Sequence, residues 1–154
     1  MKPLTGLIDS HFHLLEMQKR GIDPQSILHN LHEQGFAGGL DIGISADDVA
    51  ERAQLLAPWP KIRIAAGIGP WGAQGEHAIE AEVSRFAAAT MAYGIDCIGE
   101  IGLDYYWHYG TPTRQEELFV LQLQLAEEWK RPIVIHTREA ENDFLRLLKE
   151  RAFS

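Results

Sequence analysis

Short apolar runs alternate with longer amphipathic stretches along the chain. The runs are rich in Ile and Val, and a short run of this composition is typical of a buried β-strand. Five such runs lie at residues 7–9, 39–42, 62–68, 95–98 and 133–135. The pattern therefore predicts five buried strands, with space after each for one helix.

Between these runs, apolar residues recur every three or four positions, which is the spacing of an amphipathic helix. Asp23-Pro24 has the form of a helix start, with an N-cap residue before proline at the first helical position, and Gly35 marks the expected end. The remaining apolar stripes are Val49, Ala53 and Leu56; Ile79, Val83 and Phe86 before Gly94; Leu118, Leu121, Leu125 and Trp129; and Phe144, Leu147 and Leu148. The pattern thus predicts five successive strand-helix units.

Strands that alternate with helices form a parallel sheet covered by helices, either as a doubly wound sheet or as a closed barrel. In both architectures the chemistry lies at the carboxyl ends of the strands, but only a barrel brings the ends of the first, fourth and fifth strands around one mouth. Polar residues follow these three strands, namely His11 and His13, then Glu100, then His136. We therefore predict an α/β fold of the (β/α)8 barrel type, present here as about the first five units.

The composition is that of an ordinary globular protein. The 154 residues are 45% hydrophobic and 23% charged, and we expect residues 1–154 to form one domain. We find neither a signal-peptide pattern nor a run of about 18 apolar residues, so we expect a cytoplasmic protein without a membrane partner. Cys97 is the single cysteine, which fits a reducing compartment.

The net charge of −8 argues against nonspecific nucleic-acid binding through a basic surface. A phosphate-bearing substrate would need local positive charge, from a metal ion or from individual arginines.

The polar residues at the strand ends are of the types that bind metals. Neutral imidazole is the commonest protein ligand of transition metals, and a carboxylate adds charge or bridges two ions. Because side chains alternate along a strand, His11 and His13 point the same way. Two histidines alone are more often structural, but Glu100 and His136 at matching strand ends favour ligation. Such a set suits zinc, manganese or magnesium, which lower the pKa of a coordinated water.

Three motifs together resemble the TatD family of metal-dependent hydrolases, which are deoxyribonucleases of the amidohydrolase superfamily. They are "DSHFH" near the N-terminus, "IGEIGLDYY" at residues 98–106 and "PIVIHTREA" at residues 132–140. The resemblance implies a TIM-type barrel with two divalent metal ions that cleaves phosphodiester bonds, often from the 3' end of DNA. By position, His11 and His13 would bind the first metal, Glu100 would bridge both, and His136 would bind the second.

Asp104 and Arg138 are further catalytic candidates beside Glu100. Asp104 could orient a metal ligand through a hydrogen bond, and Arg138 could form a two-pronged contact with a phosphate. Either could equally be a solvated loop or helix-start residue.

The sequence also departs from the family pattern. Family members usually continue well past this length, with another histidine after the sixth strand and an aspartate after the eighth, so each metal would have fewer protein ligands here than a well-held site requires. Gly69 stands where the family commonly has the histidine of Gly-x-His-Pro, and Trp107 replaces an arginine often found after "LDYY". The effect of Gly69 is open.

Aromatic side chains gather in the loops expected at the catalytic end. Trp71, Tyr105, Tyr106 and Trp107 could stack on a nucleotide base, although packing between loops is at least as common. Cys97 should lie opposite Glu100 on its strand and pack against helices, so a nucleophilic role is not expected.

Three functions fit these observations. The first is a divalent-metal-dependent hydrolase of the phosphodiester bonds of DNA, with DNA as its partner. The second is an inactive remnant or fragment. The third is an amidohydrolase-type enzyme that cleaves an amide or a lactone, because nothing in "DSHFH" selects phosphorus over carbon.

Five units cannot close an eight-stranded barrel, so the two outer strands should lack partners. We expect an open, curved shell with apolar residues on its inner face, and we expect the chain to self-associate through its strand edges. The inner face is predicted to carry Ala65, Gly67, Ile98 and Val134, or their neighbours one step along.

Overall fold

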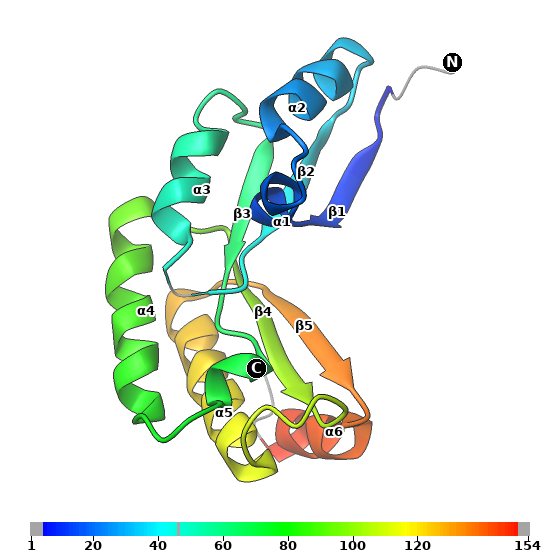
Figure 1. The fold of residues 1–154 in the computed structure, drawn as a ribbon. Coiled ribbons are helices and arrows are strands. Elements are labelled where there is room, and N and C mark those ends of the chain that lie inside the picture. The colour runs from blue at the N-terminus through cyan, green and yellow to red at the C-terminus, as the bar shows by residue number, and fades with distance from the viewer. Residues whose placement is uncertain (1–4, 46, 151–154) are drawn as a thin grey trace.

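Five parallel strands form one sheet in the computed structural model, which describes residues 5–45 and 47–150. The strands lie in chain order, and each connects to the next through helical structure (Figure 1). The strands are β1 (Ile8–Phe12), β2 (Gly38–Ile42), β3 (Ile62–Ala66), β4 (Cys97–Asp104) and β5 (Ile133–Arg138). The helical elements are α1 (Leu14–Lys19), α2 (Pro24–Glu33), α3 (Val49–Leu56), the 3-10 turn η1 (Pro70–Ala73), α4 (Ile79–Tyr93), α5 (Pro112–Trp129) and α6 (Glu141–Glu150).

The sheet is open at both sides. Within residues 5–45 and 47–150, β1 pairs only with β2, and β5 pairs only with β4. The two outer strands are accordingly the exposed ones, with Ile8 65% and Ile135 40% accessible to solvent, whereas β2 and β4 are largely buried. The architecture is the predicted α/β fold, a half-barrel of five strand-helix units.

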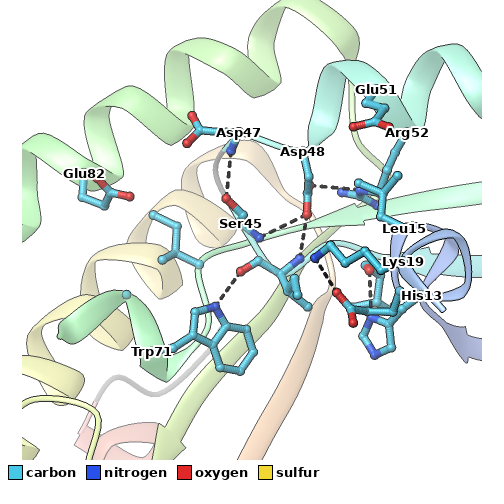
Figure 2. Close-up of a pocket in the computed structure, with 15 residues that line it drawn as sticks. His13, Leu15, Lys19, Ser45, Asp47, Asp48, Glu51, Arg52, Trp71 and Glu82 are labelled. Atoms are coloured by element: carbon cyan, nitrogen blue, oxygen red, sulfur yellow. Dashed lines mark hydrogen bonds and ion pairs between the residues drawn. The ribbon is translucent and has the colours of Figure 1, made fainter.

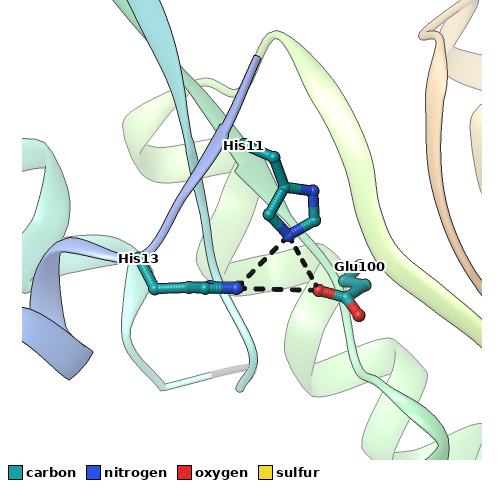
Figure 3. Close-up of side chains that lie close together, drawn as sticks. All are labelled: His11, His13 and Glu100. Carbon is teal, nitrogen blue, oxygen red and sulfur yellow. Dashed lines mark hydrogen bonds and ion pairs between the residues drawn. The ribbon is translucent and has the colours of Figure 1, made fainter. Parts of the chain in front are cut away.

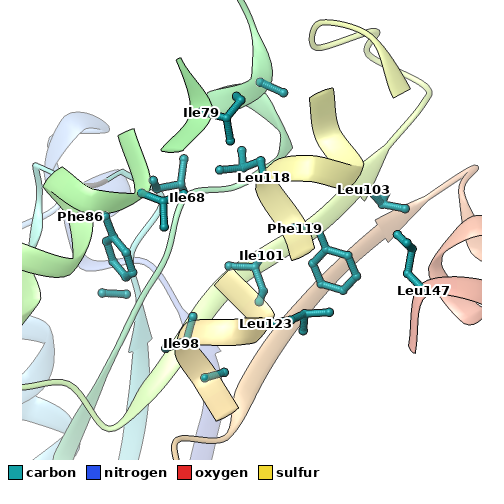
Figure 4. Close-up of a cluster of buried hydrophobic side chains, with 14 of the residues drawn as sticks. Ile68, Ile79, Phe86, Ile98, Ile101, Leu103, Leu118, Phe119, Leu123 and Leu147 are labelled. Carbon is teal, nitrogen blue, oxygen red and sulfur yellow. The ribbon is translucent and has the colours of Figure 1, made fainter. Parts of the chain in front are cut away.

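The main hydrophobic core lies between the sheet and the helices α4 and α5. Ile98, Ile101 and Leu103 of β4 pack against Phe119 and Leu123 of α5 (Figure 4). A smaller cluster under α1 and α2 contains Phe12, Leu14, Leu28, Phe36, Leu56 and Ile62. Among the described residues, we find no helix with the length and apolar character needed to cross a membrane.

The predicted helix starts and ends are confirmed where the sequence has a clear capping signal. Asp23 precedes α2, and its carboxylate accepts hydrogen bonds from the N–H groups of Gln25 and Ser26. Proline follows as the first residue of that helix, and α4 ends directly before Gly94. The short helix α1 was not predicted from the sequence.

The strands that carry the candidate site are longer than predicted. β1 continues to Phe12, so His11 lies within it and not after it. β4 continues to Asp104 and β5 to Arg138, so Glu100 and His136 also lie within strands and not after them. The cause is continued pairing of the two strands, in which Gly102 lies opposite His136. A Cβ atom at Gly102 would overlap the His136 carbonyl oxygen, so glycine permits this close approach.

For β4, the inner-face alternative that contains Ile98 is wrong, which leaves the alternative with its neighbours one step along. Ile98 packs with Ile101 against the helices, whereas the carboxylate of Glu100 lies near His11 and His13 (Figures 3 and 4). The pairing of β4 with β5 is irregular between Ile98 and Ile101, and this irregularity breaks the strict alternation on which the prediction depended.

Candidate metal centre

His11, His13 and Glu100 converge at the carboxyl edge of the sheet (Figure 3). His11 lies on β1, His13 lies between β1 and α1, and Glu100 lies on β4. The Nε2 atom of His11 is 3.3 Å from Nε2 of His13 and 3.4 Å from Oε2 of Glu100, and the third separation is 3.9 Å. In a flat sheet β1 and β4 would be about 14 Å apart, three strand spacings, so the curvature of the sheet creates this cluster.

These separations fit a single metal ion. Ligand atoms held 2.0–2.1 Å from a tetrahedral zinc ion lie about 3.4 Å apart, close to two of the three distances. The orientation of His13 also fits, because its Nδ1 atom is 2.9 Å from the carbonyl oxygen of Ile42. A carbonyl can only accept, so Nδ1 carries the proton and Nε2 of the neutral ring presents its lone pair to the cluster.

A buried ion network holds the segment around His13. Arg52 is 1% exposed and donates from Nη1 to Oδ2 of Asp41 (2.8 Å), from Nη2 to the carbonyl oxygen of Ala65 (2.9 Å) and from Nε to Oδ1 of Asp48 (3.0 Å). The other oxygen of Asp41 accepts from the N–H of Leu14, the residue after His13. Arg52 therefore connects α3, β2 and β3 to the start of α1.

The second carboxylate oxygen of Glu100 points to His136 on β5. Oε1 of Glu100 is 2.6 Å from Nδ1 of His136, and the Nε2 atom of the same ring is 2.9 Å from Oδ2 of Asp104. The hydrogen bond to Glu100 raises the pKa of His136 against the opposing effect of burial, and the bond to Asp104 raises it further. Burial raises the pKa of Glu100, but the bond from His136 and the neighbouring imidazoles bring it below its ordinary value. The arrangement favours an imidazolium between two carboxylates.

His136 would bind a second ion only after a change in this arrangement. Both of its ring nitrogens donate to carboxylates, and the 2.6 Å contact with Glu100 is shorter than the roughly 3 Å between neighbouring ligands of one ion. To bind a metal, the ring would have to lose a proton and give up one carboxylate contact. Glu100 nevertheless has one oxygen toward His11 and His13 and the other toward His136.

Arg138 lies two residues beyond His136 on β5, and its guanidinium carbon is 3.9 Å from the centre of the Tyr106 ring. Asp104 stands between these groups, because its Oδ1 atom accepts from the N–H groups of Tyr106 and Trp107 while Oδ2 faces His136. The three catalytic candidates are thus connected through His136 and the turn after β4.

Trp71 occupies the space beside Gly69. A Cβ atom at Gly69 would overlap the indole ring of Trp71, which donates from Nε1 to the carbonyl oxygen of Ile44 (2.6 Å, Figure 2) and lies edge-on to His136 with ring centres 6.0 Å apart. The backbone of Gly69 is extended, so glycine is needed here for space and not for conformation. Trp71 also lines a cavity of about 460 Å³ that reaches His13.

The residues that support the site were not predicted from the sequence. Asp41 and Arg52 stand in a strand and a helix as ordinary charged residues. Gln115 and Gln122 of α5 are also buried, and their amides bond to the backbone at Asp104 and Ile68 respectively. A polar residue within the apolar stripe of α5 is the signal that could have identified these two.

The chain is similar to a family of nucleases. Residues 8–154 match the family model described as TatD related DNase. The metal-dependent hydrolase YcfH of Escherichia coli K12, itself uncharacterized, is 28% identical over 146 residues, which cover 94% of this chain and 54% of the relative. The 3'-5' ssDNA/RNA exonuclease TatD of Yersinia pseudotuberculosis is 31% identical over 128 residues, 82% of this chain and 48% of the relative. The chain spans about half the length of these relatives.

Solved structures give the same fold. The crystal structure of YJJV, a TatD homologue from Escherichia coli K12, matches with a TM-score of 0.77 at 23% identity, over all of this chain and 62% of that one. A TatD family hydrolase from Entamoeba histolytica matches with the same TM-score at 16% identity, over 95% of this chain and 54% of that one. The half-barrel of this chain therefore corresponds to part of a larger barrel.

Proposed function

The chain belongs to the TatD-related DNase family, and we propose that it contributes the metal-binding part of a divalent-metal-dependent hydrolase that cleaves phosphodiester bonds of DNA. The observation that supports this most is the convergence of His11, His13 and Glu100 from strands that a flat sheet would separate. The name of the Yersinia relative, an ssDNA/RNA exonuclease, favours a nucleic-acid substrate over other phosphodiesters.

We propose two divalent ions, of magnesium, manganese or zinc. His11, His13 and Glu100 would hold the first, and Glu100 with His136 would hold the second once His136 has released its proton. Such ions supply Lewis-acid polarisation of the phosphate and activation of water when bound. The donor set of two imidazoles and a carboxylate suits all three metals.

The remaining roles fall to side chains around the ions. Glu100 orients its two oxygens toward different histidines, which suits a bridging carboxylate. Asp104 fixes the His136 ring through the contact with Nε2, and Arg138 provides a guanidinium for the oxygens of a phosphate. The catalytic assignments are therefore Glu100, Asp104 and Arg138.

The alternatives differ in the bond that is cleaved, or in whether any bond is cleaved. An amidohydrolase would use the same ligands on an amide or a lactone, and an inactive remnant would keep the ligands without turnover. The chain spans about half the length of its relatives, so hydrolytic activity of the 154 residues alone is a separate proposal from metal binding. A cytoplasmic location completes it, on the basis of a single free cysteine.

Metal binding and substrate choice are tested together on the full 154-residue chain. Calorimetric titration with Mn²⁺ and Zn²⁺ should show binding to the wild type and a loss of orders of magnitude in affinity in His11→Ala. The matched control is His29→Ala, an exposed histidine of α2 outside the cluster, which should bind as the wild type does.

Turnover is compared on single-stranded DNA, a nitrophenyl phosphodiester and a nitrophenyl amide, each with added metal. The proposal is supported if the wild type hydrolyses both phosphodiesters and Glu100→Gln hydrolyses neither. Hydrolysis of the amide alone would replace it with the amidohydrolase function. Tight metal binding in His11→Ala would show that the His11–His13 pair has a structural role.

A further inference from the structure

Two exposed aromatic rings and a guanidinium form a cluster at the rim of the metal centre. The rings of Tyr106 and Trp107 meet edge-on with centres 4.8 Å apart, and the Arg138 guanidinium carbon lies 3.9 Å from the Tyr106 centre and 5.5 Å from the Trp107 centre. Trp107 is 56% and Tyr106 44% exposed, and neither ring belongs to a hydrophobic core cluster of the described residues. Packing thus leaves much of both rings free to contact a ligand.

The backbone of this cluster is fixed to the metal centre by Asp104. Oδ1 of Asp104 accepts from the N–H of Tyr106 (3.0 Å) and from the N–H of Trp107 (3.1 Å), while Oδ2 contacts His136 (2.9 Å). Arg138 follows His136 by two residues on β5, so the two side chains project from the same face of the strand. The cluster therefore lies within reach of a molecule held at the metal centre.

The charge of the cluster suits a phosphate. No described carboxylate lies within ion-pair distance of the Arg138 guanidinium, although the chain as a whole carries a net charge of −8. The guanidinium carbon lies over the Tyr106 ring, a position that favours a cation–π contact and leaves N–H donors available to a ligand.

We propose that Tyr106, Trp107 and Arg138 form a binding site for one unpaired nucleotide, with the base stacked on the Trp107 indole and the phosphate paired with the Arg138 guanidinium. The inference rests on the proposed function and assigns residues of this chain to the contact with an unpaired nucleotide. A base within a duplex is already stacked on both faces, so the site selects a strand whose base is free. Stacking on an aromatic ring is open to all of the bases, because each base has an aromatic face.

The test measures binding of short, fluorescein-labelled oligothymidines by anisotropy, using the 154-residue chain. A series of oligonucleotides carries one abasic residue at successive positions. For the wild type, affinity should fall about ten-fold when the abasic residue occupies the stacked position, and little elsewhere. Trp107→Ala should bind the intact oligonucleotide about ten-fold more weakly and should no longer distinguish the abasic series.

Three variants complete the design. Trp107→Phe keeps an aromatic face and should retain the discrimination between intact and abasic strands. In Arg138→Gln, the slope of log affinity against log salt concentration should become less steep by about one unit, as expected for one lost phosphate contact. Tyr93→Ala removes an exposed aromatic side chain at the end of α4 and should change nothing.

The outcomes separate this site from the proposed function. Equal losses in Trp107→Ala for intact and abasic strands, or no binding of oligothymidine at all, would overturn the nucleotide site. Metal-dependent hydrolysis of DNA without any abasic discrimination would overturn the site and leave the hydrolase. Abasic discrimination without hydrolysis of any phosphodiester would support the site and refute the hydrolase.

Discussion

Arg52 provides the most direct test of how the fold positions His13. Replacement by methionine keeps an unbranched, flexible side chain but removes the guanidinium and every donor, so the carboxylate of Asp41, which is 0% exposed, loses its cationic partner. Asp48 loses the bond to Nε, and the carbonyl oxygen of Ala65 loses its partner at Nη2. The variant leaves a buried charge without compensation.

The expected cost follows from that burial. Removing one partner of a buried ion pair costs about 3–5 kcal/mol, because the remaining charge stays in a medium of low polarity. The free energy of unfolding of a domain is about 5–15 kcal/mol, so Arg52→Met should remove a large part of it. With a slope of about 2 kcal/mol per molar urea, the unfolding midpoint should fall by about 2 M.

The same substitution on the surface provides the control. Arg63 pairs with Asp96 at 3.5 Å, but its side chain is 66% exposed, so Arg63→Met should cost less than about 1 kcal/mol. The double variant Arg52→Met with Asp41→Asn removes the orphaned charge and should be more stable than the sum of the two single losses implies. A loss below about 1 kcal/mol in Arg52→Met, equal to that of the surface control, would refute the argument.

Three further expectations follow from other parts of the structure. Gly69→Ala should displace the Trp71 indole from the Ile44 carbonyl, lower stability by about 1–3 kcal/mol and change tryptophan emission, whereas an unchanged spectrum and midpoint would contradict the close contact. Burial raises the pKa of the Cys97 thiol, and the nearby Asp96 raises it further. At pH 8 the folded chain should therefore react with Ellman's reagent more slowly than the urea-unfolded chain, and its rate should rise as the pH passes 9. Equal rates at pH 8 would count against this. The mass measured by sedimentation should exceed the monomer mass of 17.3 kDa and should rise with protein concentration, because β1 and β5 present unpaired edges. A monomer mass at every concentration would exclude association through these edges.

Local signals were sufficient for most of the fold. The apolar runs located all five strands, and the N-cap Asp23 with its proline located the start of α2 to the residue. These features depend on neighbours within a few positions, which a sequence displays directly. The six-residue helix α1 is too short to show an apolar stripe, so it was missed.

The lengths of β4 and β5 were underestimated for a different reason. Their carboxyl-terminal halves contain polar residues and glycine, which by themselves indicate a loop. They remain strands because each pairs with the other, from Ile101 opposite Ile135 to Asp104 opposite Arg138. Such pairing is a property of two segments together and has no signature in either one alone.

The convergence of His11 with Glu100 could be anticipated from strand order and alternation, but its supports could not. A buried arginine becomes acceptable only when partners from other elements surround it, as Asp41 and Asp48 surround Arg52. Gln115 and Gln122 are a similar case. They lie seven residues apart on one face of α5, and each amide bonds to both the N–H and the carbonyl group of one residue at a strand end.

The candidate ligands are consequently held with unequal firmness. Glu100 lies on the buried strand β4, and His13 is bonded to the Ile42 carbonyl beside the Arg52 network. His11 has a side chain that is 43% exposed and belongs to β1, which pairs on one side only within the described residues. An ion shared by His11 and Glu100 would connect this outer strand to the buried one across the concave side of the sheet. Its binding free energy would then stabilise the edge of the half-barrel that backbone pairing leaves open.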